Sequence, residues 1–166
     1  MNKYRLTEET KVVAGVTVHR IQALKSFGDV TEGDLGGWVA SEANLSQEGL
    51  CWVSGKACVY RNALVFGDAK VSEDACVSGN ALVYEDAKVS GNAWVYGYAR
   101  VFGKARVFGD AEVFGNAVVF VDAGVCGNAK VFEDAMVYGY AEVSGDAWVC
   151  GDARVHKGTI TSGEHR

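Results

Sequence analysis

The sequence has 166 residues, no proline, 21 glycines and a net charge of −5 at pH 7. Its length suits one domain, and its 49% hydrophobic content is too high for a disordered chain. The mild negative charge argues against a general nucleic-acid binder, which usually carries a basic field, so we expect no nucleic-acid partner.

The start of the chain, residues 1–11, is polar and charged and has no apolar core. No uninterrupted apolar run reaches the roughly 18 residues that a membrane-spanning helix needs. The sequence therefore predicts neither a secretory signal nor a membrane anchor. Five cysteines, an odd number without a compact framework, are typical of reduced thiols. We expect a soluble protein of the cytoplasm.

Residues 1–50 differ in pattern from the rest of the chain and predict an N-terminal cap. Alternating apolar and polar residues on both sides of Gly15 indicate a β-hairpin. A first repeat follows, but two extra residues near 46–49 break the phase between Leu45 and Val53. A solenoid must protect its open end against further strand pairing, and the cap is expected to do so.

Residues 51–156 form the regular body of the chain. A valine returns at every sixth position from Val53 to Val155, and an alanine precedes each valine by two residues from Ala57 onward. Alanine and valine two residues apart face the same side of a strand, here inward. The Gly-Asp or Gly-Asn pair that ends many of the repeats suits a corner, because both residue types tolerate a positive φ.

Short strands joined by corners predict a coil. With three repeats per coil, neighbouring coils would stack through parallel strands about 4.8 Å apart. The sequence thus predicts an all-β protein, a single-chain parallel β-helix of about six to seven coils. Residues 157–166 fall outside the valine period and are expected to form a C-terminal tail.

The repeat resembles that of hexapeptide-repeat proteins, as in Ala111-Glu-Val-Phe-Gly-Asn116. That resemblance implies a left-handed β-helix, while a right-handed solenoid like that of bactofilin-like filament proteins stays open. The cap, with Gly33-Asp-Leu-Gly-Gly-Trp-Val39 and Phe27-Gly-Asp-Val30, resembles the start of YdcK-like proteins. These are hexapeptide-repeat proteins of bacterial and phage origin, termed transferases by analogy, so the resemblance implies the fold more strongly than an activity.

One outer face of the predicted coil collects large apolar and aromatic side chains. An exposed apolar surface of this size usually marks an association site, although stacked aromatics could also serve only to stabilise neighbouring coils. The resemblance favours a homotrimer, and a face-to-face dimer fits the residues equally well. The predicted interface, called the apolar face below, comprises Leu64, Phe66, Leu82, Tyr84, Phe102, Val118, Phe120, Met136 and Tyr138.

Another outer face is polar and carries three cations at 18-residue spacing, Lys70, Lys88 and Arg106, called the cation column below. A solvated surface explains such a column without any ligand. The alternative is a site for a small anion, because an anion would relieve the repulsion between like charges. No metal site is expected: Cys58 and Cys76 are neighbours on adjacent coils, but further ligands are missing. We expect these two residues to be thiols, which oxidation could join.

The sequence gives little support for catalysis. Histidine is the usual general base, and the only histidines are His19, His156 and His165, all outside residues 51–150. His19 and His156 are therefore weak catalytic candidates, His19 with Asp29 or Asp34 beside it. No coil carries an inserted loop that could hold a cofactor or an acceptor, and no cofactor is expected.

Three hypotheses remain. The favoured one is a non-catalytic oligomeric binding or scaffold protein, which could be phage-encoded and bind or sequester a host protein or a small ligand. The alternatives are an acyltransferase-like enzyme that uses His19 or His156 at a subunit interface, and a filament-forming structural protein.

Overall fold

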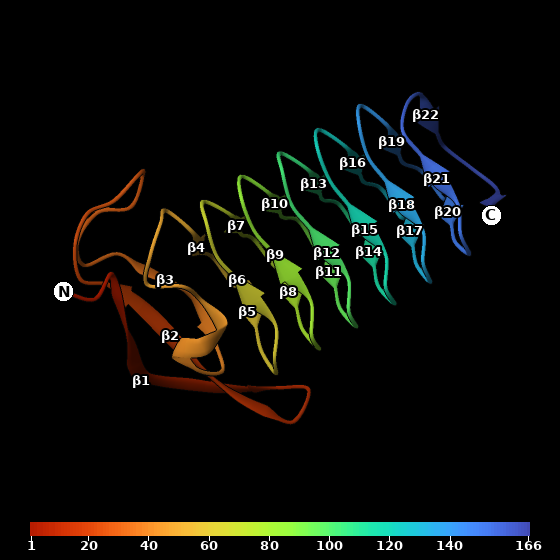
Figure 1. The fold of residues 1–166 in the computed structure, drawn as a ribbon. Helices are drawn as coiled ribbons and strands as arrows, with labels where there is room; N and C mark the ends of the chain where they lie inside the picture. Colours follow the sequence, from red (N-terminus) through yellow and green to blue (C-terminus); the bar gives the residue numbers. More distant parts are fainter.

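The computed structural model describes residues 1–166 (Figure 1). Most of its strands are short and parallel, and they stack in three sheets. They form a β-solenoid of about seven turns, so the predicted all-β parallel β-helix is confirmed. The left-handed sense stays an expectation from the resemblance. The helical content is one 3₁₀ turn, η1 (Glu42–Asn44), and no helix is long and apolar enough to cross a membrane.

The first sheet has ten strands and begins with the long strands near the N-terminus. Its members are β1 (Tyr4–Val13), β2 (Val16–Ala23), β3 (Leu35–Val39), β5 (Cys58–Val59), β8 (Cys76–Val77), β11 (Trp94–Val95), β14 (Glu112–Val113), β17 (Lys130–Val131), β20 (Trp148–Val149) and β23 (Glu164–His165).

The second sheet has seven strands and the third has six. The second sheet contains β4 (Trp52–Val53), β7 (Lys70–Val71), β10 (Lys88–Val89), β13 (Arg106–Val107), β16 (Gly124–Val125), β19 (Glu142–Val143) and β22 (Thr159–Ile160). The third sheet contains β6 (Leu64–Val65), β9 (Leu82–Val83), β12 (Arg100–Val101), β15 (Val118–Val119), β18 (Met136–Val137) and β21 (Arg154–Val155).

Each coil visits the first, third and second sheets in turn, and from β4 to β18 each strand pairs with the strand 18 residues further on. Val59 therefore lies beside Val77, and Lys70 beside Lys88. Repeat residues that share a position thus form straight columns along the stack. This register was predicted by the spacing alone, and it places every outward side chain on a known face.

The core is a single continuous interior, filled by columns of alanine and valine side chains. The repeat alanines and valines from Ala57 to Val149 are all buried, with at most 1% of their surface exposed. They belong to one hydrophobic cluster of 42 residues that also includes Tyr4, Ile21 and Leu45 from the N-terminal part. The alanine and valine side chains fill the interior, and the two hollows described below lie on the surface.

The N-terminal strands continue the first sheet with the opposite strand direction. β1 and β2 form the predicted antiparallel hairpin, β2 pairs antiparallel with β3, and β3 pairs parallel with β5. The two extra residues lie in a loop at 46–50, where the Lys3 ammonium contacts the carbonyl oxygen of Cys51 at 2.8 Å. Buried backbone groups of this irregular coil therefore find side-chain partners.

The C-terminal residues differ from the expected tail. β22 pairs with β19 and β23 pairs with β20, so the stack continues through residues 157–166. The reason is a change of spacing. Ile160 follows Val155 by five residues instead of six, and a search for the six-residue period does not detect this shorter repeat.

Candidate functional site

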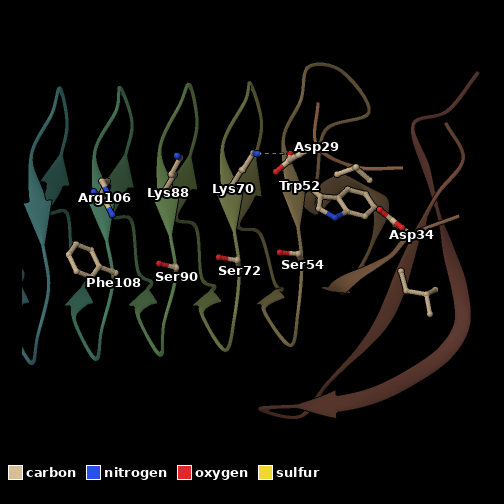
Figure 2. A pocket seen from close by; sticks show the side chains of 12 residues that line it. Asp29, Asp34, Trp52, Ser54, Lys70, Ser72, Lys88, Ser90, Arg106 and Phe108 are labelled. Atoms are coloured by element: carbon tan, nitrogen blue, oxygen red, sulfur yellow. Dashed lines mark hydrogen bonds and ion pairs between the residues drawn. The ribbon is translucent and has the colours of Figure 1, made fainter. Parts of the chain in front are cut away.

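A groove runs along the second sheet, next to the N-terminal part (Figure 2). It encloses about 550 Å³, which is within the range of small-molecule sites. This groove, named as such below, is lined by Asp29, Val30, Asp34, Leu35, Trp52, Ser54, Lys70, Ser72, Lys88, Ser90, Arg106 and Phe108.

All three members of the cation column line the groove. Lys88 is paired in register with Lys70 on one side and Arg106 on the other, so their backbones are about 4.8 Å apart. The sequence prediction that these cations are neighbours is confirmed. Whether they bind an anion stays a prediction, because the structure contains no ligand.

Lys70 differs from the other two cations because it has a carboxylate partner. Its ammonium lies 2.6 Å from an Asp29 carboxylate oxygen, which a loop of the N-terminal part brings to the groove (Figure 2). The hydrogen bond from Lys70, helped by the charge of Lys70, lowers the pKa of Asp29 below its ordinary 3.8. The contact is therefore formed at neutral pH and weakens only as acid protonates Asp29.

Lys88 and Arg106 form no ion pair. The Arg106 guanidinium lies 5.2 Å from the centroid of the Phe108 ring, a cation–π distance that positions its side chain over the groove. Two adjacent positive charges without counter-charges repel each other, and a bound anion would remove that repulsion. The free cationic part of the groove is thus centred on Lys88 and Arg106.

Three serine side chains, Ser54, Ser72 and Ser90, run beside the cation column. Figure 2 shows them in a row along the stack. Their backbone groups take part in the ladder, as in the bond from the Ser72 amide to Val89, while their hydroxyls have no protein partner. A hydroxyl can donate to an anion or accept from a ligand, so this row adds adaptable hydrogen bonds to the two cations.

Trp52 forms the wall of the groove at its N-terminal end. Its ring packs edge to face against Phe27 at 5.4 Å, and the side chain is buried. Asp34 also lines this end. The groove therefore has an aromatic wall and a carboxylate at one end and two cations at the other, with a row of hydroxyls between them.

A second, more open hollow lies on the other side of the cation column and encloses about 700 Å³. It shares all three cations but is otherwise rich in acidic corner residues, Asp68, Asp86 and Asp122, with Lys104. These carboxylates would repel an anion. The serine side is therefore the better place for an anionic ligand.

The two histidine candidates lie away from the groove. His19 is in β2, paired with Thr10 and Val39 on the first sheet. His156 follows β21 and packs against Tyr138 on the third sheet, with ring centroids 5.9 Å apart. The hypothesis that His19 forms a site with Asp29 or Asp34 gains no support, because both acids line the groove and His19 does not.

The apolar face lies on the third sheet and is a continuous ladder. The rings of Phe66, Tyr84, Phe102, Phe120 and Tyr138 stack with centroids 4.8–5.1 Å apart. Leu64 and Phe66 are exposed, Val118 is buried, and the remaining members are half-buried. Aromatic stacking that stabilises neighbouring coils, the alternative to association, is thus present. It does not test the predicted association, which stays a prediction.

The repeat spacing puts Trp52 and Phe108 on the same face as the cation column, whereas the sequence alone did not place Asp29 or Asp34 in the groove. Phe108 and the serines follow the 18-residue spacing, so their column could be read from the repeat. The loop that carries Asp29 and Asp34 has no periodic pattern, and its contact with Lys70 depends on packing between residues 41 positions apart. No sequence signal reveals such a contact.

One known protein is similar in sequence to part of this chain. No family model matches the chain. A protein of Escherichia coli (strain K12) named "Uncharacterized acetyltransferase YdcK" is 38% identical over 77 residues, which cover 42% of this chain and 22% of that protein. The chain thus spans under a quarter of the length of the curated relative that it matches.

The structure defines the class of protein: a β-solenoid, built here from six-residue repeats. Over the matched stretch, the resemblance to YdcK-like proteins is confirmed.

Proposed function

We propose that this chain is an acyltransferase-type hexapeptide-repeat protein that binds an anionic acyl donor in the groove. The observation that carries the proposal is the pair of unpartnered cations, Lys88 and Arg106, beside a row of free serine hydroxyls. The name of the E. coli relative, an acetyltransferase, supports the same class of reaction. An acyl-coenzyme A has the phosphate groups that such a site would recognise.

Lys88 and Arg106 would bind the phosphates of the donor in different ways. A guanidinium binds a phosphate with two parallel hydrogen bonds, while an ammonium acts as a compact point charge. Asp29 neutralises Lys70, so the net attraction is strongest at Lys88 and Arg106. The apolar wall at Trp52 would then contact a less polar part of the donor.

Transfer also needs a base, and no histidine lines the groove. The proposal therefore requires that His19 or His156 of a neighbouring copy reach the groove in an oligomer, or that the acceptor itself ionises. We propose a homotrimer formed through the apolar face, with a dimer as the other arrangement. We place this assembly in the cytoplasm, where the five free cysteines would stay reduced.

A transfer assay tests the proposal. Purified full-length protein is supplied with acetyl-coenzyme A and a panel of amine and hydroxyl acceptors, and release of the free coenzyme A thiol is followed. We expect turnover that falls at least tenfold in both Arg106→Met and His156→Asn if the histidine is the base. Binding of the donor without turnover for any acceptor would contradict the transferase proposal and leave a binding protein.

The second candidate is a non-catalytic binding or scaffold protein that sequesters a host protein or a small anionic ligand, in a bacterium or a phage. The absence of a histidine from the groove favours it. Affinity capture from bacterial lysate, with Lys88→Met/Arg106→Met as the control bait, separates the two. A ligand or protein retained by the natural sequence alone supports this candidate if the transfer assay is negative.

A further inference from the structure

A pair of cysteines lies on the first sheet, away from the groove. Cys58 in β5 and Cys76 in β8 are register partners, so their backbones are about 4.8 Å apart and their side chains leave the sheet on the same side. Both are free thiols. The separation lies within the range of Cα distances that a disulfide spans.

The β1–β2 hairpin covers this pair and adds a cation. Cys58 is 4% exposed and belongs to a small cluster with Val18, Trp38 and Tyr60, against which Cys76 also packs. Trp38 is the register partner of Cys58, and the Lys11 ammonium lies 4.5 Å from the centroid of a Trp38 ring. The ammonium is therefore held beside the two sulfurs by the hairpin.

The ionisable side chains that act on the thiol of Cys58 are Cys76, Lys11 from the hairpin and Asp74 from a neighbouring corner, and Tyr60 packs in the same cluster. The Lys56 ammonium lies 3.8 Å from an Asp74 carboxylate oxygen, so the charges of these two side chains offset each other. The hydrogen bond with Cys76, assisted by Lys11, outweighs burial and lowers the pKa of Cys58 to about 7. The second proton of the pair is held more tightly, which raises the pKa of Cys76.

The other three cysteines lack this arrangement. Burial is the main cause that raises the pKa of Cys51, Cys126 and Cys150. The residues at the same repeat position one coil away from them are not cysteines: Ala69 for Cys51, Phe108 and Ser144 for Cys126, and Phe132 for Cys150. They therefore serve as internal controls for any reaction at the pair.

We propose that Cys58 and Cys76 form an oxidation site at which a hydroperoxide converts the two thiols into a disulfide between adjacent coils. The Cys58 thiolate attacks the peroxide, the O–O bond breaks, and the products are a sulfenic acid and, after protonation, water or an alcohol. The Cys76 sulfur then attacks the sulfenic sulfur and expels water. Two electrons pass from the two sulfurs to the peroxide, and a dithiol reductant reverses the reaction.

Intact-mass and peptide mass spectrometry of the full-length protein test this site. After treatment with one equivalent of hydrogen peroxide at pH 7, we expect loss of two hydrogen atoms and a linked peptide pair containing Cys58 and Cys76. Dithiothreitol should restore the original mass. In Cys76→Ser, Cys58 should stop at the sulfenic acid, which dimedone traps.

Lys11→Met tests the role of the cation. We expect the disulfide to form about tenfold more slowly at pH 7, because a smaller fraction of Cys58 is ionised, and the difference should disappear above about pH 9. Cys126→Ser is the matched control and should react like the natural protein. Oxidation of Cys51, Cys126 or Cys150 at the same rate, or a Cys58 sulfinic acid without the disulfide, would overturn the proposal.

Discussion

At some corners, a residue with a strained backbone is stabilised by a hydrogen bond between its side chain and the next coil. Most corners have glycine at positive φ, but Glu73, Glu85 and Glu133 adopt φ near 60°. Each places a carboxylate oxygen 2.6–2.8 Å from the backbone amide of the glycine one coil further on. A non-glycine residue in this region is strained by about 1–2 kcal/mol, and the charged hydrogen bond offsets that strain.

Glu85 allows these two effects to be separated. Glu85→Ala keeps the strained backbone and loses the bond to the Gly103 amide, so we expect the free energy of unfolding to fall by about 1–2 kcal/mol. Glu85→Gly loses the same bond but relieves the strain, and should be nearly neutral. Urea unfolding followed by circular dichroism compares them, and equal destabilisation would contradict this account.

Gly91 and Gly15 form a second matched pair at the residue scale. Both have positive φ, but a Cβ on Gly91 would lie 2.8 Å from the backbone nitrogen and oxygen of Gly109, whereas Gly15 has open space. We expect Gly15→Ala to lower the free energy of unfolding by about 1 kcal/mol through strain alone. Gly91→Ala should lower it by at least twice as much because the stacked corner must shift, and urea unfolding measures both.

Asp29 is predicted to limit the strength of the anion site. Asp29→Asn removes the charge that neutralises Lys70, so three free cations would line the groove and affinity for a multivalent anion should rise several-fold. Asp34→Asn, also in the groove but without an ion pair, is the control. Calorimetric titration with pyrophosphate at neutral pH compares the two variants with the natural protein.

At the scale of elements, the stacked aromatic ladder stabilises the third sheet from outside. Phe102 lies between Tyr84 and Phe120, with ring centroids at 4.8 and 5.1 Å. Each stacked pair contributes about 0.5–1.5 kcal/mol beyond burial. Phe102→Ala should therefore lower the free energy of unfolding by about 1–3 kcal/mol, as measured in urea. A ladder-end change, Phe66→Ala, breaks a single pair and should have the smaller effect.

The repeat explains why the strands were predictable and the cap contacts were not. A fixed spacing determines the register of Lys88 with Lys70 and Arg106, so the part of the groove that the repeats contribute follows from counting along the sequence. The rest comes from the segment that carries Asp29, whose position depends on non-local packing of Phe27 against Trp52. The same reasoning fails at Ile160, where a five-residue step replaces the period that the prediction relied on.

For the whole molecule, the solenoid leaves the outer faces as the only places for function, because alanine and valine fill the interior. The groove and the apolar face lie on different sheets, so ligand binding and association can act together in one assembly. The N-terminal hairpin adds the third outer feature by covering Cys58 on the first sheet.

Association through the apolar face can be tested at this scale. Phe102→Asp/Phe120→Asp places two charges in its centre, and we expect a folded monomer instead of the proposed trimer, because burying an unpaired charge is strongly unfavourable. Sedimentation equilibrium measures the mass, and Trp94→Asp on the first sheet is the control. A monomeric natural protein would contradict the proposed assembly.

Calorimetric titration of the full-length protein with acetyl-coenzyme A tests the central claim, an anionic donor in the groove, most directly. We predict saturable binding that weakens as salt is raised, that falls about tenfold in Arg106→Met and in Lys88→Met, and that is unchanged in Lys56→Met, an exposed corner residue outside the groove. Undetectable binding by the natural protein, or binding that both groove variants retain in full, would contradict the claim.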